Sequence, residues 1–208
     1  GLGDVYKRQI TPSDAKKDGS KLKSFSRLSV KIILSGGNIM DYKIIEKAAF
    51  DIIEKVEAHT VDNSENAKSI PDFWTRSHND GTVKNLFDIT TDRTYIFGIC
   101  YGNLPENAKT FDYSIAAKCD KDTVVPKGFR KSTIPARTWA IFECKGAMPN
   151  AIQDKWHKIV SEFFPTSGYE PTYEMDIEAY TDGNMGSPDY RSEIWVCLLY
   201  TSDAADDR

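Results

Sequence analysis

Residues 149–165 read Pro-Asn-Ala-Ile-Gln-Asp-Lys-Trp-His-Lys-Ile-Val-Ser-Glu-Phe-Phe-Pro, and this stretch predicts an amphipathic helix. Pro149 suits the first turn of a helix, and Pro165 is expected to end it. A helix with one apolar face needs a partner surface, which the neighbouring sequence should supply. Its large apolar residues recur at helical spacing and share that face: Ile152, Trp156, Ile159, Val160, Phe163 and Phe164.

Short strands are predicted on both sides of this helix. Residues 130–134 and 138–144 precede it, and residues 173–180 and 191–196 follow it, all rich in aromatic and β-branched side chains. Residues 182–188 are loaded with Gly, Asn and Pro and make the loop between the last two strands. The predicted order is therefore β-β-α-β-β.

The preceding part of the chain repeats this order. Its helix is expected around Ile70, Phe73 and Trp74, with Gly81 breaking the run. One such unit is too small to bury its sheet well, so two should pack together. The sequence thus predicts an α+β fold: duplicated halves forming an antiparallel sheet with two helices and a central ligand cleft. The four strands expected in this first unit are residues 42–47, 50–56, 94–101 and 111–119.

The predicted domain spans residues 40–196, with halves of about 40–120 and 128–196. Residues 1–39 show no sustained helical or strand periodicity, so they are expected to form a leader outside the domain. Residues 197–208 are expected to form a tail outside it as well.

The two ends of the chain resemble translated sequencing-adapter sequence, at residues 1–9 and 197–208. The alternative is a native disordered arm and a native acidic tail. A further hypothesis takes Met40 as the start, because the Gly36-Gly37 pair could be the translation of a ribosome-binding site.

Charge and cysteine usage exclude several classes of protein. The net charge of -4 offers no electrostatic footprint for nucleic acid, and the apolar runs are too short to span a membrane. No secretory signal is visible, so a cytoplasmic protein with reduced thiols is expected. The four cysteines form no CxxC pair and have no histidine at ligand spacing, which argues against metal; no cofactor motif is present either.

Five stretches resemble the GyrI-like, or AraC-type effector-binding, family in the family's own order. The resemblance implies a tandem pair of strand-helix-strand-strand units (a duplicated SHS2-type fold) around a drug-binding cleft. Cys197 departs from it, because the family usually has proline there. The stretches are Asp-Tyr-Lys-Ile-Ile-Glu-Lys-Ala-Ala-Phe (41–50), Phe-Asp-Tyr-Ser-Ile-Ala-Ala (111–117), Ile-Pro-Ala-Arg-Thr-Trp-Ala-Ile-Phe (134–142), the helix and its exit (156–170), and Ser-Glu-Ile-Trp-Val (192–196).

Glu193 is the first candidate site residue. Strand alternation places Arg191, Glu193 and Trp195 on one face of their strand. From the residues alone, a solvated glutamate is the simpler interpretation. The resemblance instead implies that Glu193 lies at the floor of the cleft and faces cationic ligands.

Aromatic residues are the second candidate group. Phe97, Phe111 and Ile115 are expected in the core. Tyrosine and tryptophan carry polar tips that need partners and faces that attract cations, so they suit a cavity lining. The candidates for ligand binding are Trp74, Tyr101, Tyr113, Trp156 and Trp195, together with Glu193.

The acidic row Glu174, Asp176 and Glu178 alternates along one strand and is interpreted as its solvated face. A catalytic carboxylate pair in this row is the weaker interpretation. No Ser-His-Asp arrangement, nucleophile elbow or phosphate-binding glycine loop is present.

The leading hypothesis is a stand-alone module that binds an amphipathic, cationic or aromatic small molecule, as multidrug-sensing or sequestering proteins do. No helix-turn-helix is visible before Met40, so direct DNA binding is not expected without a partner protein such as a transcription regulator. One alternative implied by the resemblance is a hydrolase of cyclopropane-containing electrophiles, with Glu193 as acid or base and Tyr113 or Tyr101 as helper. Another is a protein-binding module that resembles gyrase inhibitors.

Overall fold

The computed structural model of the chain describes residues 29–33, 39–60, 62, 65–90, 93–102 and 108–199. Most of the expected leader, including Gly36-Gly37, lies outside these described residues. So does the tail from residue 200 onward.

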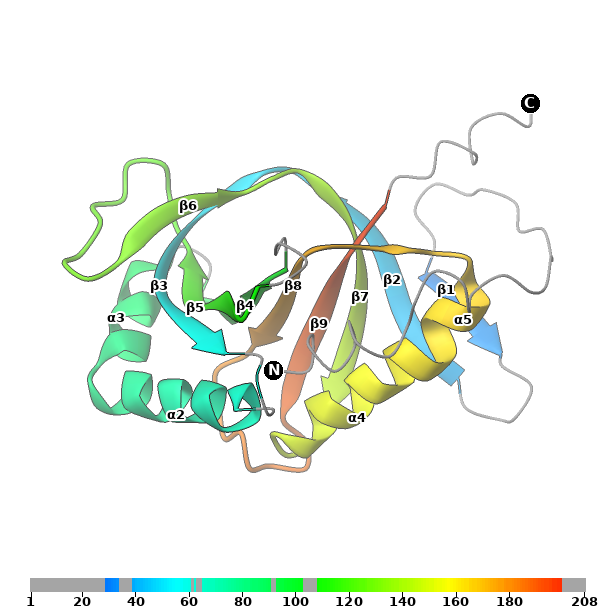
Figure 1. Ribbon diagram of the computed structural model, residues 1–208. Coiled ribbons are helices and arrows are strands. Elements are labelled where there is room, and N and C mark those ends of the chain that lie inside the picture. Colours follow the sequence, from blue (N-terminus) through cyan, green and yellow to red (C-terminus); the bar gives the residue numbers. More distant parts are fainter. Residues whose placement is uncertain are drawn as a thin grey trace.

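The described strands form one antiparallel sheet of nine strands, in the order β1-β2-β7-β9-β8-β4-β5-β3-β6 (Figure 1). The α+β class expected from the sequence is confirmed. The strands are β1 Ser29–Ile33, β2 Ile39–Lys47, β3 Phe50–Thr60, β4 Ile96–Tyr101, β5 Thr110–Lys118, β6 Arg130–Ile134, β7 Arg137–Lys145, β8 Pro171–Tyr180 and β9 Arg191–Leu198. The helices are α2 Asn66–Asn79, α3 Thr82–Ile89, α4 Asn150–Lys158 and α5 Phe164–Ser167, with a π-helical turn, Ile159–Phe163, joining the last two.

The two halves exchange their first strands. β2 pairs with β7 of the second half, and β6 pairs with β3 of the first half. The halves also meet directly where β4 pairs with β8, at the centre of the sheet. The two halves therefore share one continuous sheet.

This exchange produces an arch over one face of the sheet. β2 continues into β3 across Ala48-Ala49, and β6 continues into β7 across Pro135-Ala136. The two continuous strands run side by side and curve over the top of the molecule in Figure 1. We call the side of the sheet beneath this ribbon the arch face. A buried core lies on the arch face and a second one on the opposite face. On β7, for example, Trp139 belongs to the core of the arch face and Phe142 to the core of the opposite face.

The helices cover that opposite face, which we call the helix face. Phe73 of α2 and Leu86 of α3 pack on Ile115 of β5, while Ile152 of α4 packs on Ile194 of β9. Burying such side chains stabilises the fold by about 25 cal/mol for each Å² of apolar surface that leaves water, and this holds the helices to the sheet.

The strand alternation expected from the sequence is confirmed at β9. Ile194 and Val196 lie in the core of the helix face, whereas Trp195 lies in the core of the arch face. β9 also continues beyond the expected domain end at Val196. Cys197 and Leu198 are buried parts of this strand, exposed by only 1% and 3%.

Two features of the helices differ from the sequence expectation. Gly81 breaks the helical run as predicted, since α2 ends at Asn79 and the φ of Gly81 is 82°, in the left-handed region open to glycine; the second helix that begins after it, α3, is not predicted by the sequence. Pro165 was expected to end the long helix, which instead reaches Ser167. The π-turn Ile159–Phe163 precedes the proline, and Gly168, with φ of 75°, ends the helix.

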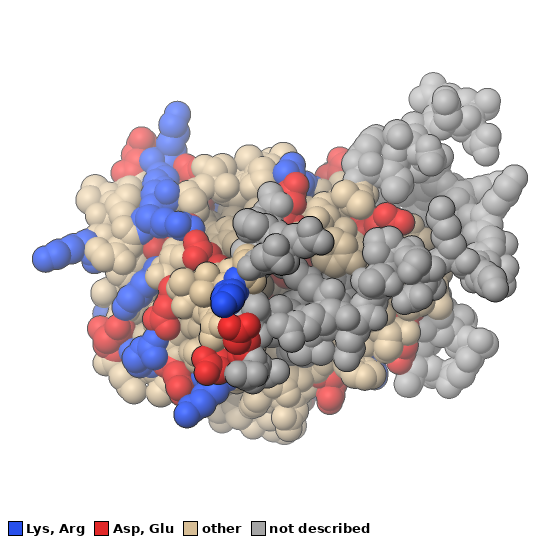
Figure 2. All heavy atoms as spheres, viewed as in Figure 1, with Lys and Arg blue, Asp and Glu red and all other residues tan. Residues whose placement is uncertain are grey.

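The described surface carries charges of both signs. In the view of Figure 2, Lys and Arg side chains lie among Asp and Glu side chains. Within the described part of the chain, no helix combines the length and apolar character needed to cross a membrane.

Candidate functional site

Helices α2 and α4 on the helix face of the sheet each carry a tryptophan that packs toward the central strands. Trp156 of α4 is 3% exposed and belongs to the apolar stripe that predicted this helix. Trp74 of α2 is half-buried and packs against the cores beneath both helices. Trp74 is therefore the more accessible of the two indoles.

Glu178 of β8 lies between these helices with its carboxylate held by neutral donors. Trp156 donates its indole N–H to Oε1 of Glu178 at 2.9 Å, and Tyr180 donates its hydroxyl to Oε2 at 2.7 Å. Glu178 takes part in none of the ion pairs found among the described residues. A half-buried carboxylate has lost part of its hydration, and here no cation of the described residues compensates its negative charge.

Tyr113 and Trp74 pack beside this carboxylate and its donors. The indole N–H of Trp74 donates to the hydroxyl of Tyr113 at 2.9 Å. The ring of Trp74 meets the ring of Tyr180 edge to face, with 5.0 Å between centroids. We call the five residues Trp74, Tyr113, Trp156, Glu178 and Tyr180 the aromatic cage.

Gly98 of β4 forms the floor beneath the cage. It pairs with Glu178 across the β4–β8 ladder, so both positions lie on the helix face. A Cβ at position 98 would overlap the hydroxyl of Tyr113 and come within 3.3 Å of Trp74 Cζ2. Only glycine leaves room for these two rings to approach the sheet.

Burial keeps the cage tyrosines neutral. Desolvation raises the pKa of Tyr113 well above its ordinary value, and the nearby Glu178 carboxylate raises it further. The pKa of Tyr180 is raised by the same two causes in the same order. Both hydroxyls thus stay protonated and polar without adding negative charge.

The structure divides the six sequence candidates between the two faces of the sheet. Trp74, Tyr113 and Trp156 come together in the aromatic cage. Tyr101, Trp195 and Glu193 belong to the arch face, as their cores and strand registers show. The six residues therefore do not form one site.

On the arch face, Glu193 has its own aromatic partner. Trp195 donates its indole N–H to Oε2 of Glu193 at 2.7 Å. The ammonium group of Lys47 lies 4.2 Å from the centroid of the Trp195 ring. A cation of the chain itself thus already covers this indole.

Tyr101 is hydrogen-bonded to a buried carboxylate, that of Glu54. Its hydroxyl donates to Glu54, which is 0% exposed, at 2.6 Å. Burial alone would raise the pKa of Glu54, but hydrogen bonds from Ser132, Tyr101 and Arg130 outweigh it, and the pKa is lowered. Glu54 is therefore a charged residue that ties β3, β4 and β6 together.

Sequence reasoning missed Glu178 and Tyr180. The interpretation of Glu178 as part of a solvated row is wrong, because the carboxylate faces the helices and accepts two hydrogen bonds. A signal was present: Trp156 lies on the apolar stripe of its helix, and a buried indole N–H needs an acceptor. An acidic residue on a strand beneath that helix could supply it.

The residue pairs expected for a hydrolase are not assembled. Glu193 and Tyr113 lie on opposite faces of the sheet, and the hydroxyl of Tyr101 is bonded to Glu54. Among the described residues, no group of three His, Cys, Asp or Glu side chains is arranged to hold a metal ion.

Known proteins of similar fold include ligand-bound and regulatory examples. SAV2435 bound to tetraphenylphosphonium shares 23% identity at a TM-score of 0.68, over 77% of this chain and 95% of that one. A putative transcription regulation protein from Staphylococcus aureus MU50 shares 25% identity at a TM-score of 0.64, over 76% and 98% of the two chains. The integron cassette protein VCH_CASS2 from the mobile metagenome of Vibrio cholerae shares 17% identity at a TM-score of 0.56, over 76% and 95%.

No curated protein matches the chain. The sequence profile of the Cass2 family, described as integron-associated effector-binding proteins, matches residues 43–198. This match includes both halves of the sheet, the aromatic cage and the buried end of β9. The chain therefore belongs to the Cass2 family of integron-associated effector-binding proteins.

Proposed function

We propose that this protein binds small amphipathic organic cations in the aromatic cage of the helix face, with Glu178 as the counter-ion. The observation that carries the proposal is the carboxylate of Glu178. It is held by Trp156 and Tyr180, both neutral, and no Lys or Arg of the described residues pairs with it. A cationic ligand would supply the missing charge.

The aromatic rings fit the same class of ligand. Indole and phenol faces attract cations by about 0.5–2 kcal/mol each, more strongly where water is excluded. They also bury large apolar surfaces without directional demands, so one cage can accept lipophilic cations of different shape. This is the physical basis of a multidrug-type specificity.

Entry of a ligand requires movement of Trp74. Its hydrogen bond to Tyr113 and its edge contact with Tyr180 close the cage between α2 and the sheet. Trp74 is only half-buried, so it can leave these contacts at lower cost than Trp156. The ligand would then replace the Trp74 contacts with its own.

A regulatory or sequestering role follows from binding of this kind. SAV2435, which has this fold, is described with tetraphenylphosphonium bound, and the S. aureus protein is described as a putative transcription regulation protein. We propose that ligand capture by this chain is either read by a partner protein or used to remove the compound from solution.

The test is calorimetric titration of tetraphenylphosphonium into wild type, Glu178→Gln and Glu193→Gln proteins. Both substitutions remove one charge from a strand glutamate that accepts an indole N–H, so they are matched. Loss of the counter-ion in Glu178→Gln should weaken binding by about tenfold or more, because the bound charge then lacks its partner. Glu193→Gln should bind within about twofold of wild type.

The opposite ranking would contradict the proposal. If Glu193→Gln loses affinity and Glu178→Gln does not, the ligand lies on the arch face and Glu193 is the counter-ion. If wild-type protein shows no saturable binding to a panel of lipophilic cations, the proposed function is wrong.

A further inference from the structure

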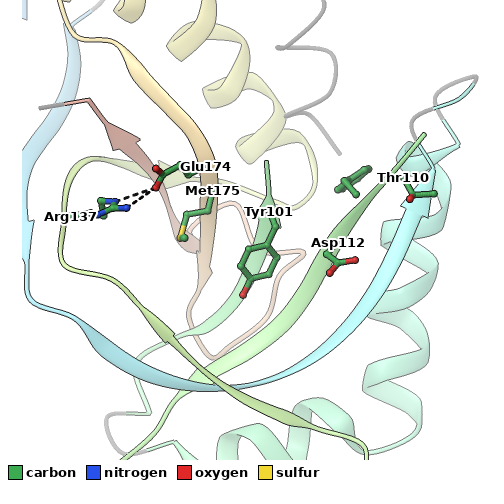
Figure 3. Close-up of a pocket in the computed structure, with 7 residues that line it drawn as sticks. Tyr101, Thr110, Asp112, Arg137, Glu174 and Met175 are labelled. Atoms are coloured by element: carbon green, nitrogen blue, oxygen red, sulfur yellow. Dashed lines mark hydrogen bonds and ion pairs between the residues drawn. The ribbon is translucent and has the colours of Figure 1, made fainter. Parts of the chain in front are cut away.

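A cavity of about 560 Å³ opens on the arch face, on the other side of the sheet from the aromatic cage (Figure 3). This volume lies within the range of small-molecule sites. Its lining residues come from four strands, β4, β5, β7 and β8: Tyr101, Thr110, Phe111, Asp112, Arg137, Glu174 and Met175. We call it the arch pocket.

An irregularity in β8 shapes one wall of the arch pocket. The pairing with β9 shifts register between Pro171 and Asp176, which leaves extra residues on β8. Tyr173 within this bulge has a φ of 58°, a left-handed conformation that a tyrosine rarely adopts. The bulge breaks the alternation of β8, so that Glu174 and Met175 both line the pocket.

The apolar part of the pocket is held in place from behind. The hydroxyl of Tyr101 donates to Glu54 at 2.6 Å, and this hydrogen bond fixes the ring. Glu54 itself does not line the pocket. Tyr101 and Met175 both pack against the core of the arch face, whereas the ring of Phe111 belongs to the core of the helix face. Tyr101 and Met175 therefore form a preformed apolar surface of the kind that binds the body of an organic ligand.

The charged part of the pocket favours a positive ligand group. Arg137 already has partners within the protein. Its Nε and Nη2 both donate to Oε2 of Glu174, at 3.3 and 2.9 Å, and its Nη1 donates to the carbonyl of Ala136. The second lining carboxylate, Asp112, is exposed and takes part in none of the ion pairs found among the described residues. One Arg against two carboxylates leaves the lining with a net negative charge.

We propose that the arch pocket is a second ligand site, which takes small aromatic amines. The ammonium group would lie between Asp112 and the side of the Glu174 carboxylate that faces away from Arg137, and the ring would lie against Tyr101 and Met175. This site is distinct from the aromatic cage, because the two lie on opposite faces of the sheet. It would let one chain hold two different compounds at once.

The probe is 2-phenylethylamine, with 2-phenylethanol as its neutral counterpart of similar shape. Titrations followed by NMR amide shifts use the full-length chain with Glu178→Gln, which weakens the cage as a competing cation site. Saturable shifts are expected at Asp112, Glu174 and their strand neighbours with the amine. The alcohol should bind at least fivefold more weakly.

Asp112→Asn should weaken amine binding by about threefold, because an exposed ion pair is weakened by water and by salt. Asp112→Asn with Glu174→Gln should weaken it by about tenfold. Asp122→Asn, at another exposed position, is the matched control and should leave binding unchanged. The side chain of Asp112 makes none of the hydrogen bonds or ion pairs found among the described residues, so its variant tests the site even if the double variant is destabilised.

Three results would overturn this second site: equal binding of amine and alcohol, unchanged affinity in Asp112→Asn, or amine shifts confined to the helix face. None of them bears on the cage, which is tested by the response of tetraphenylphosphonium binding to Glu178→Gln. The two proposals can therefore fail separately.

Discussion

The side chain of Tyr113 on β5 reaches diagonally across the β4–β5 ladder to Gly98 on β4, and its hydroxyl occupies the space that a side chain at position 98 would need. The same hydroxyl accepts the indole N–H of Trp74. The floor of the aromatic cage is thus set by the absence of one Cβ. This close approach links the β4 sequence to the position of α2.

Gly98→Ala should therefore disturb both stability and ligand binding. The added methyl group forces Tyr113 and Trp74 away from the sheet, and such overpacking costs about 1–3 kcal/mol. Tyr113→Phe removes the atom that collides, so the double variant should recover part of the loss. Urea unfolding of the four proteins measures this coupling. Strictly additive effects would show that the two residues do not interact.

The buried carboxylate of Glu54 should be a main support of the arch. It accepts hydrogen bonds from Tyr101 at 2.6 Å, Ser132 at 2.6 Å and Arg130 at 2.9 Å. Glu54→Gln should lower the free energy of unfolding by about 1–3 kcal/mol, because buried donors lose a charged acceptor.

Glu57→Gln on the same strand is the control for Glu54, since Glu57 pairs with Arg76 at the surface and should cost under about 1 kcal/mol. The pKa of Glu54 is lowered in the folded state, so its contribution is present above the unfolded value and is lost as the pH falls. Equal destabilisation by the two variants would contradict the assigned role of Glu54.

Stability should also depend on His59. His59 is 2% exposed, and its ring lies beside the rings of Phe73 and Phe111. A hydrogen bond of 2.7 Å joins its Nδ1 to Oγ of Ser69. Burial lowers the pKa of His59, so the unfolded chain binds protons more readily below about pH 6.5. The free energy of unfolding should therefore fall as the pH drops from 6.5 to 5.

His59→Gln should flatten this part of the stability profile, and His157→Gln, at an exposed position, should not. Thermal unfolding at half-unit pH steps makes the comparison. A wild-type profile that is flat between pH 7 and 5 would remove His59 as a titrating group.

The cysteines should differ in reactivity toward iodoacetamide at pH 8. Cys100 is half-buried, whereas Cys119, Cys144 and Cys197 are buried. Burial raises the pKa of Cys144 to about 12, so its thiolate is scarce at that pH. Mass spectrometry of the native protein should show Cys100 modified first. Modification of Cys144 at a similar rate would mean that α4 opens readily.

Most strands could be predicted because their signals are local. The expected ranges 130–134 and 138–144 match β6 and β7 closely. The helix α3 could not be predicted in the same way. A glycine within a helical pattern indicates a break, and nothing local shows that a second helix begins directly after Gly81; that depends on packing.

The candidate site was only partly predictable, because it combines residues from both halves and from both kinds of element. The indoles of Trp74 and Trp156 were found as amphipathic residues on helices. Glu178 was not found, because a row of alternating acids resembles a solvated strand face. Only the packing of α4 over β8 turns that face inward, and the bulge at Tyr173 then sends Glu174 to the other side.

The four tryptophans of the chain report on the central claim most directly, because two lie on each side of the sheet. Trp74 and Trp156 belong to the aromatic cage, and Trp139 and Trp195 belong to the core of the arch face. The measurement is an ¹⁵N NMR titration of the indole N–H signals with tetraphenylphosphonium. We predict large saturable shifts for Trp74 and Trp156 and small ones for Trp139 and Trp195. Shifts confined to Trp139 and Trp195 would contradict the proposed cage.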